Sequence, residues 1–245
     1  MTASSVSDTA PGYTDTPFLP GGEYRVHDAD RPRPAAVDPG EPLDNGAPPG
    51  DATVLLDEDG LHGWEQTGGG TVAWIEDGGV VTVEPGSGDI NTTDSIGDCQ
   101  LHLEWAAPPE TEGDGQGRGN SGVFLMDRYE IQVLDTYDNP TYADGYAGAV
   151  YGQHPPLVNP VRPPGEWQSY DILWQAPRFD GDAVDTPARV SVLFNRVTVQ
   201  HATAVFGPTT HRDVSPYEPH GDAPLRLQDH GDRVRFRNIW YRSVE

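Results

Sequence analysis

Lysine is absent from this 245-residue sequence, so all 15 basic residues are arginine, and they face 39 acidic ones. The formal net charge is −24, a field that repels nucleic acid and anionic membranes, so neither is expected as a partner. An Asp-rich surface without lysine is typical of halophilic proteins, in which high salt screens the self-repulsion. We therefore expect a halophilic source. The alternative is an acidic surface that serves solubility alone.

Cysteine is nearly absent too, since Cys99 is the only one, so no internal disulfide can form. We expect Cys99 to be a small buried hydrophobic residue rather than a nucleophile. The first residues contain no basic start and no apolar run, which argues against a secretory signal, and no stretch is apolar enough for a transmembrane helix. These absences predict a cytoplasmic protein.

Sustained helical periodicity is also missing, because no window keeps it for three turns without meeting glycine or proline. Short runs of β-branched and aromatic residues recur instead between turn signals. The predicted strands are 52–56, 71–75, 80–83, 100–105, 122–125, 129–134, 169–174, 189–194, 197–200, 225–228 and 233–241, with a hairpin turn at 77–79. This pattern predicts an all-β sandwich or jelly roll over residues 51–245. Residues 1–50, rich in Pro, Gly and Asp, are predicted to form an extended arm on that domain or a loose leader.

The most informative predicted strand contains Glu130 and Gln132. Alternation places these two side chains on one face, while Tyr129, Ile131 and Val133 share the other. A charge in so apolar a strand is costly unless it faces water, a ligand or a partner, so the strand is predicted to form the floor of a polar binding cleft.

A second acid follows the same strand. A one-residue bulge would bring Asp135 to the face of Glu130, and paired carboxylates are what glycoside hydrolysis needs. The spacing resembles the Glu-x-Asp-x-x-Glu strand of laminarinase-like glucanases, with Gln132 in place of the middle acid and Asp135 in place of the last. A solvated strand face followed by a turn aspartate explains this motif equally well.

Other candidate residues are spread along the chain. His102 and Glu104 share a strand face and could form an acid/base pair, metal ligands, a sugar clamp or only a cross-strand ion pair. Arg118 and Asn120 lie in a glycine-rich loop and could hold a sugar hydroxyl or an oxyanion. His230 lies at the start of the last predicted strand.

Three further candidates lie elsewhere in the chain. Gln153 and His154 lie in a proline-rich aromatic loop formed by residues 152–156 and 165–167. Trp174 ends the predicted strand 169–174 and could stack on a sugar, with a core position as the alternative. The sequence contains no short zinc-type motif, so a divalent cation would have to be assembled from distant residues.

Taken together, these stretches resemble the 3-keto-disaccharide hydrolase family from about residue 51 to the end. The resemblance runs through residues 88–90, 101–104, 117–123, 129–135, 142–145, 149–153, 164–172, 176–179, 227–231 and 234–240. One departure is Asn195-Arg196, which replaces the expected Asn-Gly hairpin turn and predicts a remodelled turn there.

The resemblance implies a concanavalin A-like jelly roll of two antiparallel sheets that acts on a glycoside or oligosaccharide with a ketone at C3. Such a ketone acidifies the C2 proton, so a base can remove it, the group at C1 can leave, and water can then add. A glycoside 3-oxidoreductase would have to supply the ketone. No cofactor is implied with certainty.

The resemblance also suggests roles for the candidate residues. Glu130 would be the base and His102 or His230 the acid. The remaining candidates would bind substrate, the first three by holding the oxyanion and hydroxyls: Arg118, Asn120, Gln132, Glu104, Asp135, Gln153, His154 and Trp174. A non-catalytic carbohydrate-binding module and a purely structural β-domain are the alternatives, since the same scaffold serves all three.

Overall fold

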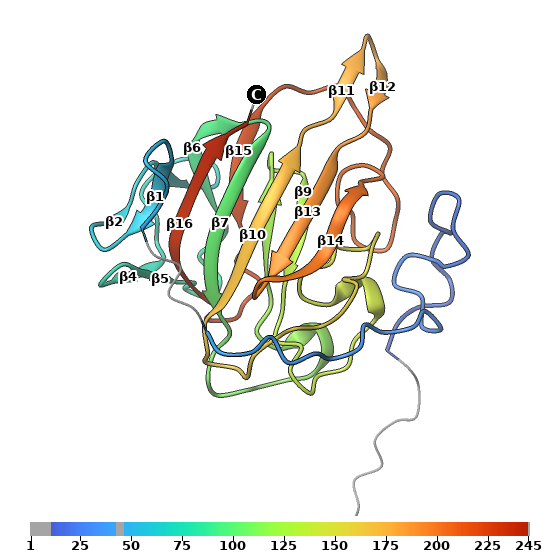
Figure 1. The fold of residues 1–245 in the computed structure, drawn as a ribbon, viewed down its shortest axis with the longest axis horizontal. Helices are drawn as coiled ribbons and strands as arrows, with labels where there is room; N and C mark the ends of the chain where they lie inside the picture. Colours follow the sequence, from blue (N-terminus) through green and yellow to red (C-terminus); the bar gives the residue numbers. More distant parts are fainter. Residues whose placement is uncertain (1–10, 43–46, 245) are drawn as a thin grey trace, which may run out of the picture.

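Two antiparallel sheets face each other in the computed structural model, which describes residues 11–42 and 47–244 (Figure 1). The larger sheet has nine strands in the order β14-β13-β10-β7-β16-β1-β2, with β5 also paired to β16 and β4 to β5. Its strands are β1 (Thr53–Asp57), β2 (Gly60–Leu61), β4 (Ile75–Asp77), β5 (Val80–Thr82), β7 (Cys99–Ala106), β10 (Gln168–Gln175), β13 (Arg189–Phe194), β14 (Val197–Ala204) and β16 (Arg235–Ser243).

The smaller sheet has five strands in the order β3-β6-β15-β8-β9. They are β3 (Trp64–Gln66), β6 (Ile90–Ile96), β8 (Ser121–Leu125), β9 (Tyr129–Val133) and β15 (Ala223–Leu227). A separate hairpin consists of β11 (Arg178–Asp180) and β12 (Ala183–Thr186), and the described helical turns are η1 (Gly115–Gly117) and η2 (Ala143–Gly145). Within the described ranges, no helix is long and apolar enough to cross a membrane.

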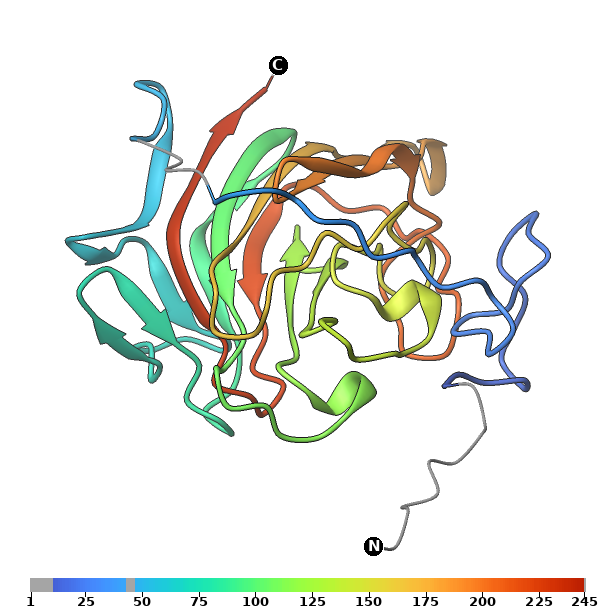
Figure 2. The same ribbon diagram turned by 60° about the horizontal axis from the view of Figure 1, so that its bottom comes forward.

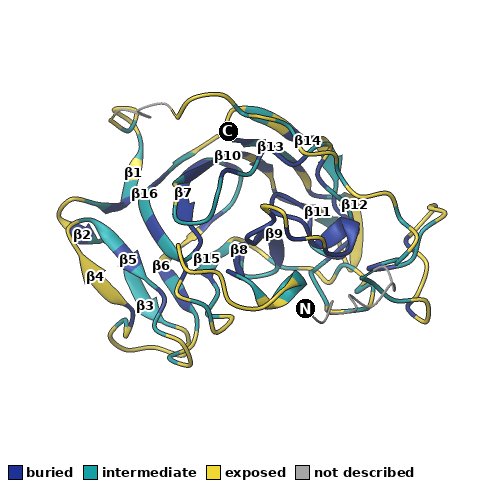
Figure 3. Cartoon of the chain, turned by 90° about the horizontal axis from the view of Figure 1, so that it is seen from below, coloured by how far each residue is buried: buried dark blue, intermediate teal, exposed yellow. Residues whose placement is uncertain are grey.

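The core lies between the two sheets and follows the alternation of the strands. From β7 it receives Leu101, Leu103 and Trp105, and from β9 it receives Tyr129, Ile131 and Val133. Figure 3 shows the buried residues gathered along the central strands, with exposed residues in β4 and the outer loops. The intervening side chains of β7 and β9 therefore lie on the outer faces of two different sheets.

This architecture confirms the predicted all-β sandwich, consistent with a jelly roll, and most of the predicted strands. Cys99 is a buried core residue, 1% exposed, and burial raises the pKa of its thiol to about 12, as expected for a hydrophobic rather than a reactive cysteine.

Three local predictions need correction. Residues 71–74 form no strand, because β4 starts only at Ile75, although the predicted turn at Gly78-Gly79 does join β4 to β5. Strand β6, rich in Thr, Asn and Asp, was not expected at all. The Asn195-Arg196 turn is not remodelled: both residues adopt positive φ (49° and 71°) between the paired Phe194 and Val197, so arginine occupies a position that glycine usually fills.

The described part of the N-terminal arm packs on the domain. Thr16, Leu19, Val26 and His27 are buried, and Ala36 forms a parallel bridge with Asn159. Figure 2 shows the arm in blue, running from an outlying loop across the domain. Residues 11–42 thus follow the packed-arm alternative, while residues 1–10 and 43–46 lie outside the described ranges.

Candidate active site

Glu130 and Gln132 lie on the face of β9 that points away from the core. The cross-strand neighbours are Phe124 for Glu130 and Gly122 for Gln132. A Cβ atom at Gly122 would lie 2.6 Å from Glu130 Oε1, so glycine is needed there to make room for the carboxyl group. With its nitrogen toward Glu130, the Gln132 amide donates to Glu130 Oε1 and to the Ser121 carbonyl, each at 3.0 Å.

Two adjoining hollows cover this part of the sheet. The smaller, with a volume of ≈ 230 Å³, is lined by Asn120, Phe124, Glu130, Gln132, Tyr151, Thr209, His211, Gln228 and His230. The larger, of ≈ 500 Å³, is lined by Pro11, Gly12, Tyr13, Asp114, Gly115, Gln116, Asn120, Thr141, Tyr142, Tyr151, His211 and His230. Four residues line both hollows, namely Asn120, Tyr151, His211 and His230, so the two form one cleft above Glu130.

Burial makes the Glu130 carboxyl group an unusually weak acid. The residue is 5% exposed, and desolvation raises the pKa of its carboxyl from 4.5 to about 8, against an opposing effect of the Arg226 guanidinium. Arg226 is shared with other carboxylates, because it pairs with Asp89 at 2.6 Å and Asp127 at 2.5 Å. A carboxyl group with a pKa near neutrality is suited to general acid or base catalysis.

A chain of hydrogen bonds forms another wall of the cleft. The Tyr151 hydroxyl lies 2.7 Å from the Tyr142 hydroxyl and 3.2 Å from His211 Nδ1. Burial raises the pKa of Tyr151 and lowers that of His211, so both groups are neutral near pH 7. Tyr151 can therefore donate a hydrogen bond to a ligand, and the neutral His211 ring can accept a proton from Tyr151 or return one to it.

The glycine-rich loop and the loop that carries His230 are tied together. The Asn120 backbone N–H donates to Asp232 Oδ2 at 2.8 Å, and the Ser121 hydroxyl donates to the Gln228 carbonyl at 2.7 Å. The structure thus gathers four of the sequence-predicted residues, Glu130, Gln132, Asn120 and His230, around one cleft.

His102 and Glu104 do not join this cleft, which corrects the suggestion that His102 serves as its acid. They lie on the outer face of the larger sheet, with the core between them and Glu130. His102 Nδ1 lies 2.8 Å from Asp171 Oδ1 and the ring stacks on Trp240, while Glu104 forms an ion pair with Arg237 at 2.7 Å. They form a cross-strand ionic network, the alternative weighed from the sequence.

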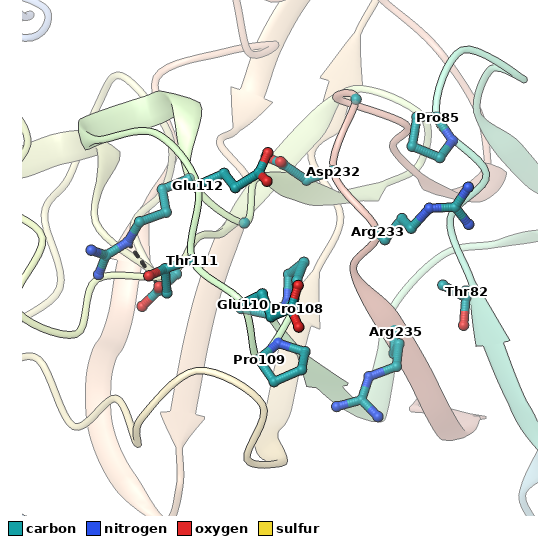
Figure 4. Close-up of a pocket in the computed structure, with 15 residues that line it drawn as sticks. Thr82, Pro85, Pro108, Pro109, Glu110, Thr111, Glu112, Asp232, Arg233 and Arg235 are labelled. Carbon is teal, nitrogen blue, oxygen red and sulfur yellow. Dashed lines mark ion pairs between the residues drawn. The ribbon is translucent and has the colours of Figure 1, made fainter.

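Arg118 and Asp135 form an ion pair with each other at 2.8 Å, and neither is among the residues that line the two hollows over Glu130. No bulge brings Asp135 to Glu130, and its pKa is raised chiefly by burial. The pair borders a separate cavity of ≈ 540 Å³, in which Arg233 and Arg235 lie on one side and the segment 108–112 on the other (Figure 4). The paired-carboxylate arrangement of ordinary glycosidases is therefore not formed by these two acids.

Three further predicted binding residues have structural positions, which corrects their expected role. Trp174 is a core residue, 2% exposed, that packs on Tyr129. Gln153 forms hydrogen bonds with the backbone of residues 206 and 207, and the His154 ring packs against Phe206 in a tilted arrangement. Gln153 and His154 thus hold the segment that leads to the cleft residues Thr209 and His211.

Several cleft residues were not singled out from the sequence. They are Tyr151, His211, Thr209, Gln228, Phe124, Gln116, Thr141 and Tyr142, together with the arm residue Tyr13. Phe124 and Gln228 are the two that alternation could have found, because each lies on the outward face of a predicted strand, 122–125 and 225–228. The others come mainly from loops, whose paths alternation does not predict.

The described residues offer no cluster of three or more His, Cys, Asp or Glu side chains that could hold a metal ion. The divalent cation considered from the sequence therefore has no candidate ligand set in residues 11–42 and 47–244.

Comparison with known proteins gives a consistent result. No curated protein matches the chain. A solved structure of a putative glycosyl hydrolase from Parabacteroides distasonis is 43% identical, with a TM-score of 0.78, over 80% of this chain and 84% of that one. A second structure described in the same words and from the same organism is 21% identical, with a TM-score of 0.53, over 75% of this chain and 89% of that one, and shows the shared fold alone.

The family comparison covers nearly the whole domain. The model of the 3-keto-alpha-glucoside-1,2-lyase-like domain matches residues 51–242. Together with the 43% identical glycosyl hydrolase-like structure, this match supports a carbohydrate-active enzyme. The chain belongs to the 3-keto-alpha-glucoside-1,2-lyase-like family.

Proposed function

We propose that this protein cleaves the glycosidic bond of 3-keto-glycosides, with Glu130 as the base that removes the C2 proton. The observation that carries the proposal is the buried Glu130 carboxyl at the floor of the cleft, with a pKa of about 8. Its carboxylate is a stronger base than an exposed one, as abstraction of a proton from carbon requires.

The reaction proceeds by elimination. The C2–H bond breaks, its proton passes to Glu130, and its electron pair forms an enolate with the C3 ketone. The enolate then re-forms the ketone while C1 and C2 become doubly bonded and the C1–O bond breaks. The leaving oxygen takes a proton, and water can add across the new double bond to give the 3-keto sugar.

The cleft also contains groups that can protonate the leaving oxygen and groups that can stabilise the enolate. His230 and the Tyr151–His211 pair line it and are within the set of side chains that can protonate a leaving group.

The Asn120 amide gives one N–H to the Gln116 carbonyl, and its second N–H is suited to bond the enolate oxygen or a sugar hydroxyl. The Gln132 amide uses its N–H groups on Glu130 and Ser121, so it positions the base. The reaction requires a preceding enzyme that oxidises the C3 hydroxyl to a ketone.

A binding module is the runner-up, but the buried carboxyl argues against it. A buried carboxyl group that is costly to ionise gives little benefit to a protein that only binds a neutral sugar. Catalysis by proton abstraction, in contrast, uses the raised pKa directly.

The test is release of a chromogenic group from a 3-keto-glucoside, with the parent glucoside as the substrate control. We expect release from the keto compound alone, and a loss of at least about 100-fold in Glu130→Gln. Glu58→Gln, an exchange at an exposed loop position, is the matched control and should retain full activity. Full activity in Glu130→Gln, or equal release from both substrates, would contradict the proposal. Sugar binding without release would favour the module.

A further inference from the structure

The N-terminal arm forms part of the cleft. Pro11, Gly12 and Tyr13 line the larger hollow, although they lie outside the family-matched residues 51–242. The Tyr13 ring is only partly buried, and its centroid lies 6.1 Å from that of Tyr142 and 6.3 Å from that of His211. The arm therefore presents an aromatic side chain to the same space that opens above Glu130.

Backbone pairing fixes the position of Tyr13. Its N–H donates to the His27 carbonyl at 2.8 Å, and the Ala29 N–H donates to the Tyr13 carbonyl at 3.3 Å. This pairing depends on Gly12, because a Cβ there would lie 2.6 Å from Ala29 Cα and 2.7 Å from the His27 oxygen. Arg212 covers one side of the Tyr13 ring at 4.0 Å from its centroid.

A buried contact anchors this part of the arm to the domain. His27 and Asp144 are both fully buried, and Asp144 accepts from the His27 backbone N–H at 2.9 Å and lies 3.0 Å from His27 Nδ1. The His27 ring packs against the Tyr142 ring at an interplanar angle of 34°, with the centroids 4.0 Å apart. Because Tyr142 also bonds Tyr151, the arm is packed against the wall of the cleft itself.

We infer that the larger hollow binds the group attached to C1, and that Tyr13 of the arm determines which group fits there. The inference rests on the proposed function, which places the reacting ring over Glu130 in the smaller hollow. The C1 substituent must then extend past Asn120, Tyr151, His211 and His230, the residues shared by both hollows.

The chemistry of the larger hollow specifies the class of this group. Aromatic rings of Tyr13, Tyr142 and Tyr151 lie beside the polar side chains of Gln116 and Thr141. Aromatic faces pack on the C–H surface of a sugar ring, while amides and hydroxyls bond its hydroxyl groups. A second sugar ring, which the disaccharides of the family's name carry, fits this combination better than a purely apolar group. Tyr13, which lies outside the family-matched residues, adds an aromatic face for that ring.

Binding of unoxidised sugars tests this inference independently of turnover. The full chain and its variants are titrated with glucose and with a glucose disaccharide by calorimetry. The wild type is expected to bind the disaccharide at least about tenfold more tightly than glucose, a difference of about 1.4 kcal/mol. Tyr13→Ala should lose most of that difference without changing the affinity for glucose, and Tyr13→Phe should keep it.

A second pair of variants tests the position of the arm without replacing Tyr13. Gly12→Ala should push the arm strand off its partner and lower disaccharide affinity in the same way, although Tyr13 is still present. Gly50→Ala, where an added Cβ meets nothing within 4 Å, is the matched control and should bind as the wild type does.

Three results would overturn the inference: equal affinity of the wild type for both sugars, unchanged disaccharide affinity in Tyr13→Ala, or an equal loss for both sugars. Failure of the proposed function looks different. In that case the wild type releases nothing from a 3-keto-glycoside, whereas the selective loss of disaccharide binding in Tyr13→Ala is still observed.

Discussion

Replacing Glu130 by glutamine should stabilise the folded protein increasingly as the pH rises. Burial raises the pKa of this carboxyl from 4.5 to about 8, so folding takes up a proton between these two values. Below the lower value both states are protonated and Glu130 has no effect on stability. As the pH rises toward about 8, the wild type loses stability, because the unfolded chain ionises Glu130 more readily. Glutamine cannot ionise and avoids this loss.

The size of the effect follows from the two pKa values. Each unit of difference corresponds to about 1.4 kcal/mol, so the full destabilisation above about pH 8 approaches about 5 kcal/mol. Less than about 1 kcal/mol of it is already present at about pH 5. The advantage of Glu130→Gln should therefore grow by about 4 kcal/mol between about pH 5 and about pH 9, which corresponds to about 10 °C in melting temperature for a domain of this size.

Urea unfolding of the wild type and Glu130→Gln at a series of pH values measures this advantage. Other groups titrate as well, but they contribute equally to both proteins and cancel in the difference. Glu58→Gln, exposed in a loop, should give a curve parallel to that of the wild type. If the Glu130→Gln and wild-type curves also run parallel within about 0.5 kcal/mol, Glu130 titrates as an ordinary carboxyl and the argument for its role as base fails.

Four other outcomes are expected. The value of kcat/KM for a 3-keto-glucoside should rise with pH and level off above about 8, the pKa of Glu130, and a profile already flat from about pH 5 would contradict the assignment. Gly122→Ala, whose Cβ would lie 2.6 Å from Glu130 Oε1, should lower activity about 100-fold, as judged by steady-state kinetics on protein with an unchanged circular dichroism spectrum. Burial alone would lower the pKa of His102, but the Asp171 and Glu104 carboxylates outweigh it and raise that pKa to about 9. His102→Asn should therefore cost about 3 kcal/mol of stability below about pH 6.5, a cost that disappears as the pH rises through about 9, with catalysis unchanged. The melting temperature should rise from low to molar salt if the acidic, lysine-free surface is an adaptation to salt, and salt-independent melting would argue for solubility alone.

The fold was predictable because alternation and turn chemistry dominate this chain. Gly78-Gly79 between two short apolar runs predicted the β4–β5 hairpin, and the alternation in β7 and β9 predicted which side chains enter the core. Strand β6 was missed because its sequence is mostly Asn, Thr, Asp and Ser, so pairing with its neighbours rather than its own composition makes it a strand.

The site was only partly predictable, for a physical reason that His102 and Glu130 illustrate. Both are polar residues on the outward face of an apolar strand, and alternation alone gives them equal standing. The two strands belong to opposite sheets, so one residue lies in the cleft and the other in an ion-pair network. Tyr151 and His211 could not be found in this way, because loops held by tertiary contacts bring them to Glu130.

The central claim is removal of the C2 proton by Glu130, and its most direct test is the fate of that proton in heavy water. The wild type is incubated with a 3-keto-glycoside in D2O, and the C2 position of the released sugar is read by proton NMR, with enzyme-free substrate as the control for spontaneous exchange. Our account predicts that the C2 proton is lost when elimination stops at the double bond, and that deuterium enters C2 when Glu130 exchanges its proton with D2O before water adds. A released sugar that keeps its C2 proton, together with no primary kinetic isotope effect from a substrate deuterated at C2, would show direct displacement at C1 and contradict the account.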